Sequence, residues 1–143
     1  MSDRPVLFSA PMVLALLEGW KTQTRRVMKP QPHSTESIVS YDSRCGKWMS
    51  CEPSPVTGGT RQMDPWRTVL IQPGDRLWVR EAWQALCEFD HLAPRDIPPG
   101  STIIHNASRP DMPWASRKRP SMFMPRWASR LTLIVESVKV ERL

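Results

Sequence analysis

The chain has 143 residues, of which 40% are apolar, and a formal net charge of +6. This length is typical of one domain, and the apolar fraction is enough to build a core. No apolar run approaches the ~20 residues of a membrane span, and residues 1–8 carry Asp3 and Arg4 and lack the long apolar stretch of a signal peptide. We therefore expect a cytoplasmic protein with no membrane partner.

The three cysteines are Cys45, Cys51 and Cys87. An odd number argues against a complete disulfide framework, and the spacing of the first two is not one that binds zinc. We expect ordinary thiols, no metal and no cofactor.

The N-terminal region is predicted to be a short strand followed by a short helix. The strand covers residues 4–9, and Ser9 is placed to cap a helix that tolerates Pro11 in its first turn. Met12, Val13, Leu16 and Leu17 share one helical face, and Gly19 stands where helices end. Residues 22–27 then favour a β-strand.

The middle of the chain is predicted to be rich in loops. Residues 28–68 contain five prolines and no periodicity, which predicts a long insertion loop that is functional or mobile. Pro73-Gly74-Asp75 predicts a tight turn before a strand over 76–81. Further proline-rich loops are expected at 90–101 and 109–120, and short strands at 102–105 and 121–124.

The last predicted strand changes phase. Leu131, Leu133 and Val135 share one parity, whereas Val138 and Val140 share the other, which predicts a bulge or bend at 136–137.

One helix, several short strands and long loops indicate an α+β domain over 1–143 with a small barrel-like sheet. Because the chain stops at the end of a strand, we expect a shortened or truncated domain.

Positive charge is concentrated in two blocks. Residues 1–30 carry a net charge of +3, and residues 114–130 carry five Lys/Arg and no acid. Two basic blocks on one small domain favour a polyanion, nucleic acid first, although a solvated basic surface is the simpler alternative. Trp20, Trp114 and Trp127 lie beside these cations, where an indole can stack on a base or on an arginine of the fold.

The first block contains a motif that resembles a known family. Gly19-x-Lys21-x-x-Thr24-x-Arg26 is similar to the Gly-x-Lys-x-x-Glu-x-Arg signature of ASCH domains. The turn at 73–75, the preceding helix, the bulged late strand and Met124-Pro-Arg-Trp-Ala-Ser-Arg130 resemble ASCH-like proteins of bacteriophages and prophages. The resemblance implies a PUA-like β-barrel with a short N-terminal helix, long proline-rich loops and a cleft lined by the signature residues, in a bacterial host cell.

The functions of that family are RNA binding, RNA cleavage and hydrolysis of N4-acetylcytidine. Its hydrolase branch uses a lysine and a threonine that match Lys21 and Thr24, and a glutamate on a later helix that this chain does not reach. From the residues, Thr24 is a candidate nucleophile and Lys21 a candidate base, and they converge only if Lys21 lies in a turn and Thr24 begins a strand. Glu81 is the best available acid, or else the partner of Arg25 or Arg26 in a salt bridge.

Three hypotheses follow. The first is binding of nucleic acid (RNA before DNA) or of a modified nucleoside, the second is hydrolysis of an acylated nucleobase or of RNA, and the third is non-catalytic binding of a host protein. The candidate catalytic residues are Lys21, Thr24 and Glu81. The remaining candidates are the ligand-binding residues Trp20, Thr22, Arg25, Arg26, Arg126, Trp127 and Arg130, and the contacts to nucleic-acid phosphates Arg117, Lys118 and Arg119.

Overall fold

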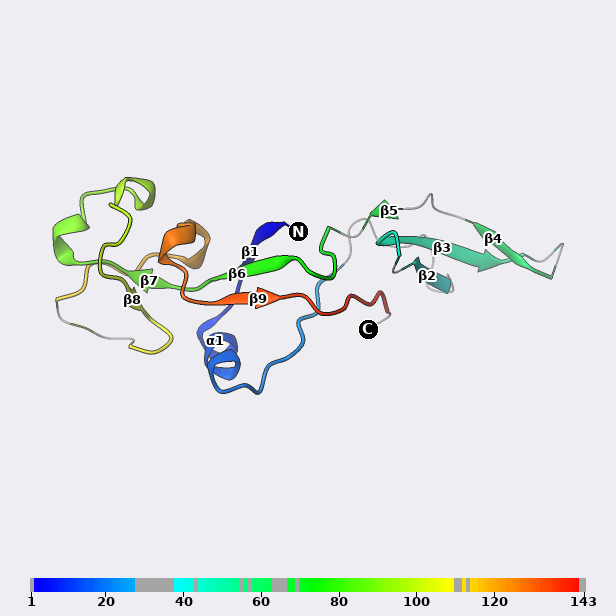
Figure 1. The fold of residues 1–143 in the computed structure, drawn as a ribbon, viewed down its shortest axis with the longest axis horizontal. Coiled ribbons are helices and arrows are strands. Elements are labelled where there is room, and N and C mark those ends of the chain that lie inside the picture. Colours follow the sequence, from blue (N-terminus) through cyan, green and yellow to red (C-terminus); the bar gives the residue numbers. More distant parts are fainter. Residues whose placement is uncertain are drawn as a thin grey trace. The chain divides into compact units, whose positions relative to one another are not determined.

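The structure is a computed structural model that describes residues 2–27, 38–42, 44–54, 56, 58–62, 67–68, 70–109, 112 and 114–141. These residues form a mixed α+β fold with one α-helix (Figure 1). In chain order the elements are β1 (Asp3–Leu7), α1 (Ala10–Leu17), β2 (Ile38–Asp42), β3 (Lys47–Pro53), β4 (Thr60–Gln62), β5 (Arg67–Thr68), β6 (Arg76–Arg80), β7 (Trp83–Gln84), η1 (Cys87–Phe89), η2 (Pro94–Asp96), β8 (Ile104–His105), η3 (Ser121–Phe123), η4 (Arg126–Ala128) and β9 (Thr132–Ile134).

The chain divides into two compact units. Unit 1 contains Met1–Thr24 and Arg76–Ile134, and unit 2 contains Arg25–Asp75 and Val135–Leu143. The strands of the described residues form three sheets, and none of these sheets closes into a barrel. The α+β prediction is thus confirmed, while the barrel and the single domain over 1–143 stay predictions.

Unit 1 is organised around β6, which lies between β1 and β9 (Figure 1). β1 runs parallel to β6, with Asp3 opposite Arg76, and β9 runs antiparallel, with Ile134 opposite the same residue. Leu77, Trp78 and Val79 of β6 are all buried, as expected for a strand covered on both faces. The strand predicted over 76–81 is confirmed with its end at Arg80, and the strand predicted over 4–9 is shifted by one or two residues.

The turn that precedes β6 also agrees with the prediction. Gly74 has a φ of +87°, a conformation that only glycine adopts at low cost. The Asp75 backbone N–H donates to the Gln72 carbonyl at 3.0 Å. This turn therefore sets where β6 begins.

Helix α1 begins and ends where the sequence predicts. Ser9 is its N-cap residue in an extended conformation and Pro11 lies in the first turn, although the Ser9 side chain makes no capping hydrogen bond. Only Val13 of the helix is fully buried. Because an eight-residue helix is marginal in water, this packing has to stabilise it.

A second part of unit 1 packs around Trp83 and β7. Its buried cluster comprises Trp83, Ala85, Ile97, Met124 and Ala128. The strand predicted over 102–105 is confirmed for β8, which pairs with β7. The strand predicted over 121–124 is wrong, because η3 occupies that position between Pro120 and Pro125. The two prolines fix φ at both ends and favour a single tight turn.

Unit 2 corrects the prediction of a long loop over 28–68. Its described residues contain β2, β3, β4 and β5, and β3 pairs antiparallel with each of the others. Among the β3 residues whose burial the structure describes, Trp48 and Cys51 are buried, and they have opposite parity. A strand without period-two burial gives no alternating signal, which is why periodicity missed it.

The end of the described chain keeps the predicted phase change but not the predicted strand. Leu131, Leu133 and Val135 are half-buried, Glu136 and Ser137 are both exposed, and Val138 and Val140 are half-buried again. β9 nevertheless ends at Ile134, and residues 135–141 have no regular secondary structure. In the part of the chain that the structure describes, no helix is long and apolar enough to cross a bilayer.

Candidate functional site

A pocket of about 490 Å³ lies beside helix α1 in unit 1. One wall comes from the helix, with Pro11, Met12 and Ala15, and the other comes from Trp20 to Gln23. The basic and hydroxyl-rich motif of the sequence therefore lines a broad depression that is open to solvent. We call it the motif pocket.

The end of the helix directs the motif into this position. Gly19 has a φ of +78°, and the backbone N–H groups of Trp20 and Lys21 both donate to the Ala15 carbonyl, at 2.8 and 3.0 Å. The Gly19 N–H donates to the Leu16 carbonyl at 3.1 Å, which completes a Schellman motif. The chain therefore reverses direction at Gly19 and returns along the helix.

The lysine and the tryptophan of the motif present different chemistry. The Lys21 Nζ donates to the Gln23 carbonyl at 2.7 Å and lies 5.7 Å from the centre of the Phe8 ring. Trp20 is 81% exposed, the most exposed tryptophan among those whose exposure the structure describes. The pocket thus combines a fixed ammonium group with an indole whose face is open to solvent.

The proposed catalytic residues are not gathered in this pocket. Thr24 is exposed and is not one of its lining residues, and residues 21–27 have no regular secondary structure, so the strand predicted to begin at Thr24 is wrong. Glu81 is 2% exposed. Arg130 donates to both of its oxygens, from Nε at 2.8 Å and from Nη2 at 3.0 Å. The partner of Glu81 is therefore Arg130, not Arg25 or Arg26.

Arg25 and Arg26 open unit 2, and both are exposed. An Arg25 Nη2 lies 3.8 Å from the Glu141 carboxylate, in a pair whose side chains are both more than half exposed. Surface pairs of this kind contribute little to stability. The Arg25 guanidinium can therefore exchange this partner for another anion.

The candidates from the second basic block make contacts within the protein. Arg126 donates from Nε to Asp3 at 2.9 Å and from Nη2 to the Thr132 hydroxyl at 3.3 Å. Trp127 packs against the cluster around Trp83. Together with Arg130, these residues hold unit 1 together, and none of them lines the motif pocket.

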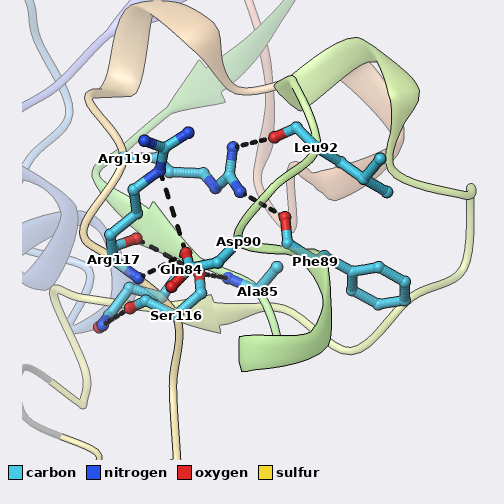
Figure 2. Close-up of polar contacts among 8 residues, drawn as sticks. All are labelled: Gln84, Ala85, Phe89, Asp90, Leu92, Ser116, Arg117 and Arg119. Atoms are coloured by element: carbon cyan, nitrogen blue, oxygen red, sulfur yellow. Dashed lines mark hydrogen bonds and ion pairs between the residues drawn. The ribbon is translucent and has the colours of Figure 1, made fainter.

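Arg119 corrects the prediction of a basic run that contacts phosphates. Figure 2 shows its guanidinium pointing to two backbone carbonyls, those of Phe89 at 2.8 Å and Leu92 at 3.0 Å. The residue is buried, and its guanidinium lies 5.5 Å from the Trp83 ring. Burial lowers the pKa of Arg119, and the neighbouring charge of Arg117 lowers it further. Arg119 therefore connects its own loop to the segment that contains Phe89 and Leu92, beside Trp83 of β7.

The neighbours of Arg119 fall into two groups. Ser116 is buried: its hydroxyl accepts from the Ala85 N–H at 3.1 Å, and its carbonyl accepts from Gln84 Nε2 at 2.6 Å (Figure 2). Arg117 and Lys118 are exposed; the Arg117 backbone N–H donates to the Asp90 carboxylate at 3.0 Å, and its guanidinium forms a loose pair with the same carboxylate at 3.9 Å. Of the three predicted phosphate contacts, only these two remain at the surface.

A second pocket, lined by Arg80, Arg95 and Phe123 among others, was not predicted from the sequence. The sequence does indicate one contact of Arg80. Residues two apart on a strand share a face, so Arg80 is expected to lie beside Trp78. The Arg80 guanidinium indeed lies 4.5 Å from the Trp78 ring. Nothing comparable in the sequence indicates Arg95 or Phe123.

The described residues contain no group of three His, Cys, Asp or Glu side chains placed to hold a metal ion. The three cysteines are free thiols. No protein-family model matches the chain, and no curated protein or solved structure matches it either.

Proposed function

We propose that this protein binds nucleic acid or a modified nucleoside through the motif pocket, and that it prefers RNA to DNA. The observation that carries the proposal is the open face of Trp20 beside Lys21 in the wall of that pocket. An aromatic face stacks on any base, and an ammonium group beside it attracts phosphate. The Thr22 hydroxyl and the Gln23 amide, in the same wall, can donate to and accept from a base edge.

The distribution of charge supports a polyanionic ligand. The chain carries a net charge of +6, and Arg117 and Lys118 add exposed cations to unit 1. Cations outside the pocket would contact phosphates without reading sequence. The resemblance of Gly19-x-Lys21-x-x-Thr24-x-Arg26 to the ASCH signature, with the PUA-like barrel that it implies, agrees with the same class of ligand.

Binding of fluorescein-labelled oligonucleotides at several salt concentrations tests the proposal. We expect an RNA octamer, U8, to bind with an affinity that falls steeply with salt. Trp20→Ala should weaken binding roughly tenfold, because one base loses its stacking partner. Lys21→Ala should reduce the slope of log affinity against log salt by about 0.7, the value for one lost contact to a single strand.

Matched controls locate the site. Trp114 is an exposed indole that lines neither pocket, and Lys139 is an exposed lysine of unit 2. Substituting either by alanine should leave the affinity within about twofold of wild type. Binding to RNA and DNA that is absent or insensitive to salt would overturn the proposal and favour a protein partner.

Hydrolysis is the rival function, and incubation of the protein with N4-acetylcytidine and with RNA tests it. In the structure both Glu81 oxygens are occupied by Arg130, and of the three candidate catalytic residues only Lys21 lines the motif pocket. Binding is therefore the function that these contacts support better. Release of cytidine or cleavage of RNA that depends on Lys21 would establish the enzyme instead.

A further inference from the structure

The second pocket, of about 340 Å³, is built from three separate stretches of unit 1. Arg80 lies at the end of β6, Arg95 lies in η2, and Phe123 lies in η3. The remaining lining residues are Ala93, Pro94, Met122, Met124 and Pro125. We call it the η3 pocket.

One of its two arginines is fixed in place. The Arg80 Nη1 donates to the Met122 carbonyl at 3.0 Å, and the guanidinium lies 4.5 Å from the Trp78 ring. These contacts hold the cation at the pocket wall before any ligand arrives. A preorganised guanidinium loses less entropy when it binds an anion.

The second arginine is open to solvent. The Arg95 side chain is 88% exposed, and its Nε lies 3.7 Å from Asp96, which is itself more than half exposed. A pair of this kind is weak. Among the described residues that line the η3 pocket there is no carboxylate, so its two guanidinium groups are the charged groups of a mostly apolar lining.

The apolar part of the wall offers an aromatic face. Phe123 and Met122 are each 55% exposed, although both are large apolar side chains. An open phenyl ring beside two guanidinium groups can stack on a base and contact its phosphate. This combination fits a nucleotide better than an acidic peptide, which has no planar ring to place on Phe123.

The two pockets share a neighbour. The Phe8 N–H donates to the Arg80 carbonyl at 3.0 Å, and the Phe8 ring lies 5.7 Å from the Lys21 Nζ. Phe8 therefore connects a residue of the motif pocket to a residue of the η3 pocket within unit 1.

We infer that the η3 pocket binds a further nucleotide of the strand held at the motif pocket, so that the ligand is a single-stranded oligonucleotide and not a free nucleoside. The inference rests on the proposed function. In this arrangement Phe123 stacks on the second base, while Arg80 and Arg95 contact its phosphates. Duplex cannot be held in this way, because its bases are already stacked on each other.

Titration of UMP, U2, U4 and U8 against the full chain tests the inference. We expect affinity to rise from UMP to the oligomers. Phe123→Ala and Arg95→Ala should each weaken U8 about five- to tenfold and leave UMP within twofold of wild type, whereas Trp20→Ala should weaken both ligands. Arg109→Ala, which removes an exposed arginine of unit 1 that lines neither pocket, is the matched control.

Two further variants distinguish stacking from simple apolar contact. Phe123→Trp should retain or strengthen U8 binding, and Phe123→Leu should weaken it nearly as much as alanine. All of these side chains are exposed, so circular dichroism and thermal melting should match wild type. If leucine serves as well as phenylalanine, or if a poly-glutamate peptide competes with U8 at Arg95, the stacking assignment is wrong.

The same experiment separates this inference from the proposed function. If Trp20→Ala weakens U8 while Phe123→Ala and Arg95→Ala do not, the motif pocket binds its ligand alone and the η3 pocket has no part in it. If wild-type protein binds neither UMP nor U8, both proposals fail together.

Discussion

Arg130 holds both carboxylate oxygens of the buried Glu81, with its Nε 2.8 Å from one and its Nη2 3.0 Å from the other. The two residues are 49 positions apart, and the pair joins the end of β6 to the segment before β9. Paired planar groups of this kind have defined geometry, which fixes the relative position of the two segments.

Removing the arginine of this pair should destabilise the protein strongly. Arg130→Ala leaves the Glu81 charge buried without its partner, and we expect a loss of about 3 kcal/mol in the free energy of unfolding, measured with urea. Glu81→Gln should cost less, about 1 kcal/mol, because Arg130 is partly exposed and can be solvated. If both variants lost the same free energy of unfolding, the explanation from the deeper burial of Glu81 relative to Arg130 would be wrong.

Arg119 and Arg117 offer a matched test of structural against surface cations. Arg119→Met should lower the free energy of unfolding by about 2–4 kcal/mol, because the carbonyls of Phe89 and Leu92 lose their charged donor. It should leave the salt dependence of U8 binding unchanged. Arg117→Met should change the free energy of unfolding by no more than about 0.5 kcal/mol, and it should reduce the slope of log affinity for U8 against log salt.

The Asp42 carboxyl should titrate below its ordinary value. Hydrogen bonds from the Arg44 side chain and backbone lower its pKa below the ordinary value of 3.8. The resulting stabilisation is therefore present above the pKa of the unfolded chain and is lost as the pH falls through the lower folded pKa. An NMR titration should show this depressed pKa, and Arg44→Ala should move it upward; no movement would exclude the side-chain contact.

Substitution by alanine should lower the free energy of unfolding by different amounts at Gly19 and at Gly46. Gly19→Ala meets no atom within contact distance, so only the strain of positive φ remains, about 1–2 kcal/mol. Gly46→Ala has the same strain, at a φ of +63°, and also collides with the side-chain amide of Gln72. We expect its cost in urea unfolding to be larger and to fall when Gln72→Ala is added, whereas additive losses would exclude the collision.

Local signals predicted the first part of unit 1 well. The cap position of Ser9, the proline at position 11 and Gly19 are read from short stretches of sequence, and the helix ends where they indicate. The turn at Gly74 and the start of β6 are local in the same sense. The turn predicted at Trp20 to Thr22 lies at residues 18–19 instead, and residues 20–27 have no regular secondary structure.

The partners of the charged residues could not be predicted, because they lie far apart in the chain. Arg126 reaches Asp3 across 123 positions, and Arg119 reaches Phe89 across 30. A basic run in the sequence does not indicate which of its members folds inward. Arg117, Lys118 and Arg119 are indistinguishable as basic residues in the sequence, whereas in the structure the first two are exposed and the buried Arg119 donates to two backbone carbonyls.

The central position of β6 has a consequence for synthesis. β1 and β6 leave the ribosome well before residues 132–134, so one edge of β6 has no native partner until β9 emerges. During that interval the nascent chain presents Leu77, Trp78 and Val79 on an unpaired strand, the kind of surface that promotes aggregation. Nascent chains halted before Thr132 should therefore recruit chaperones, and chains halted after β9 has emerged should release them.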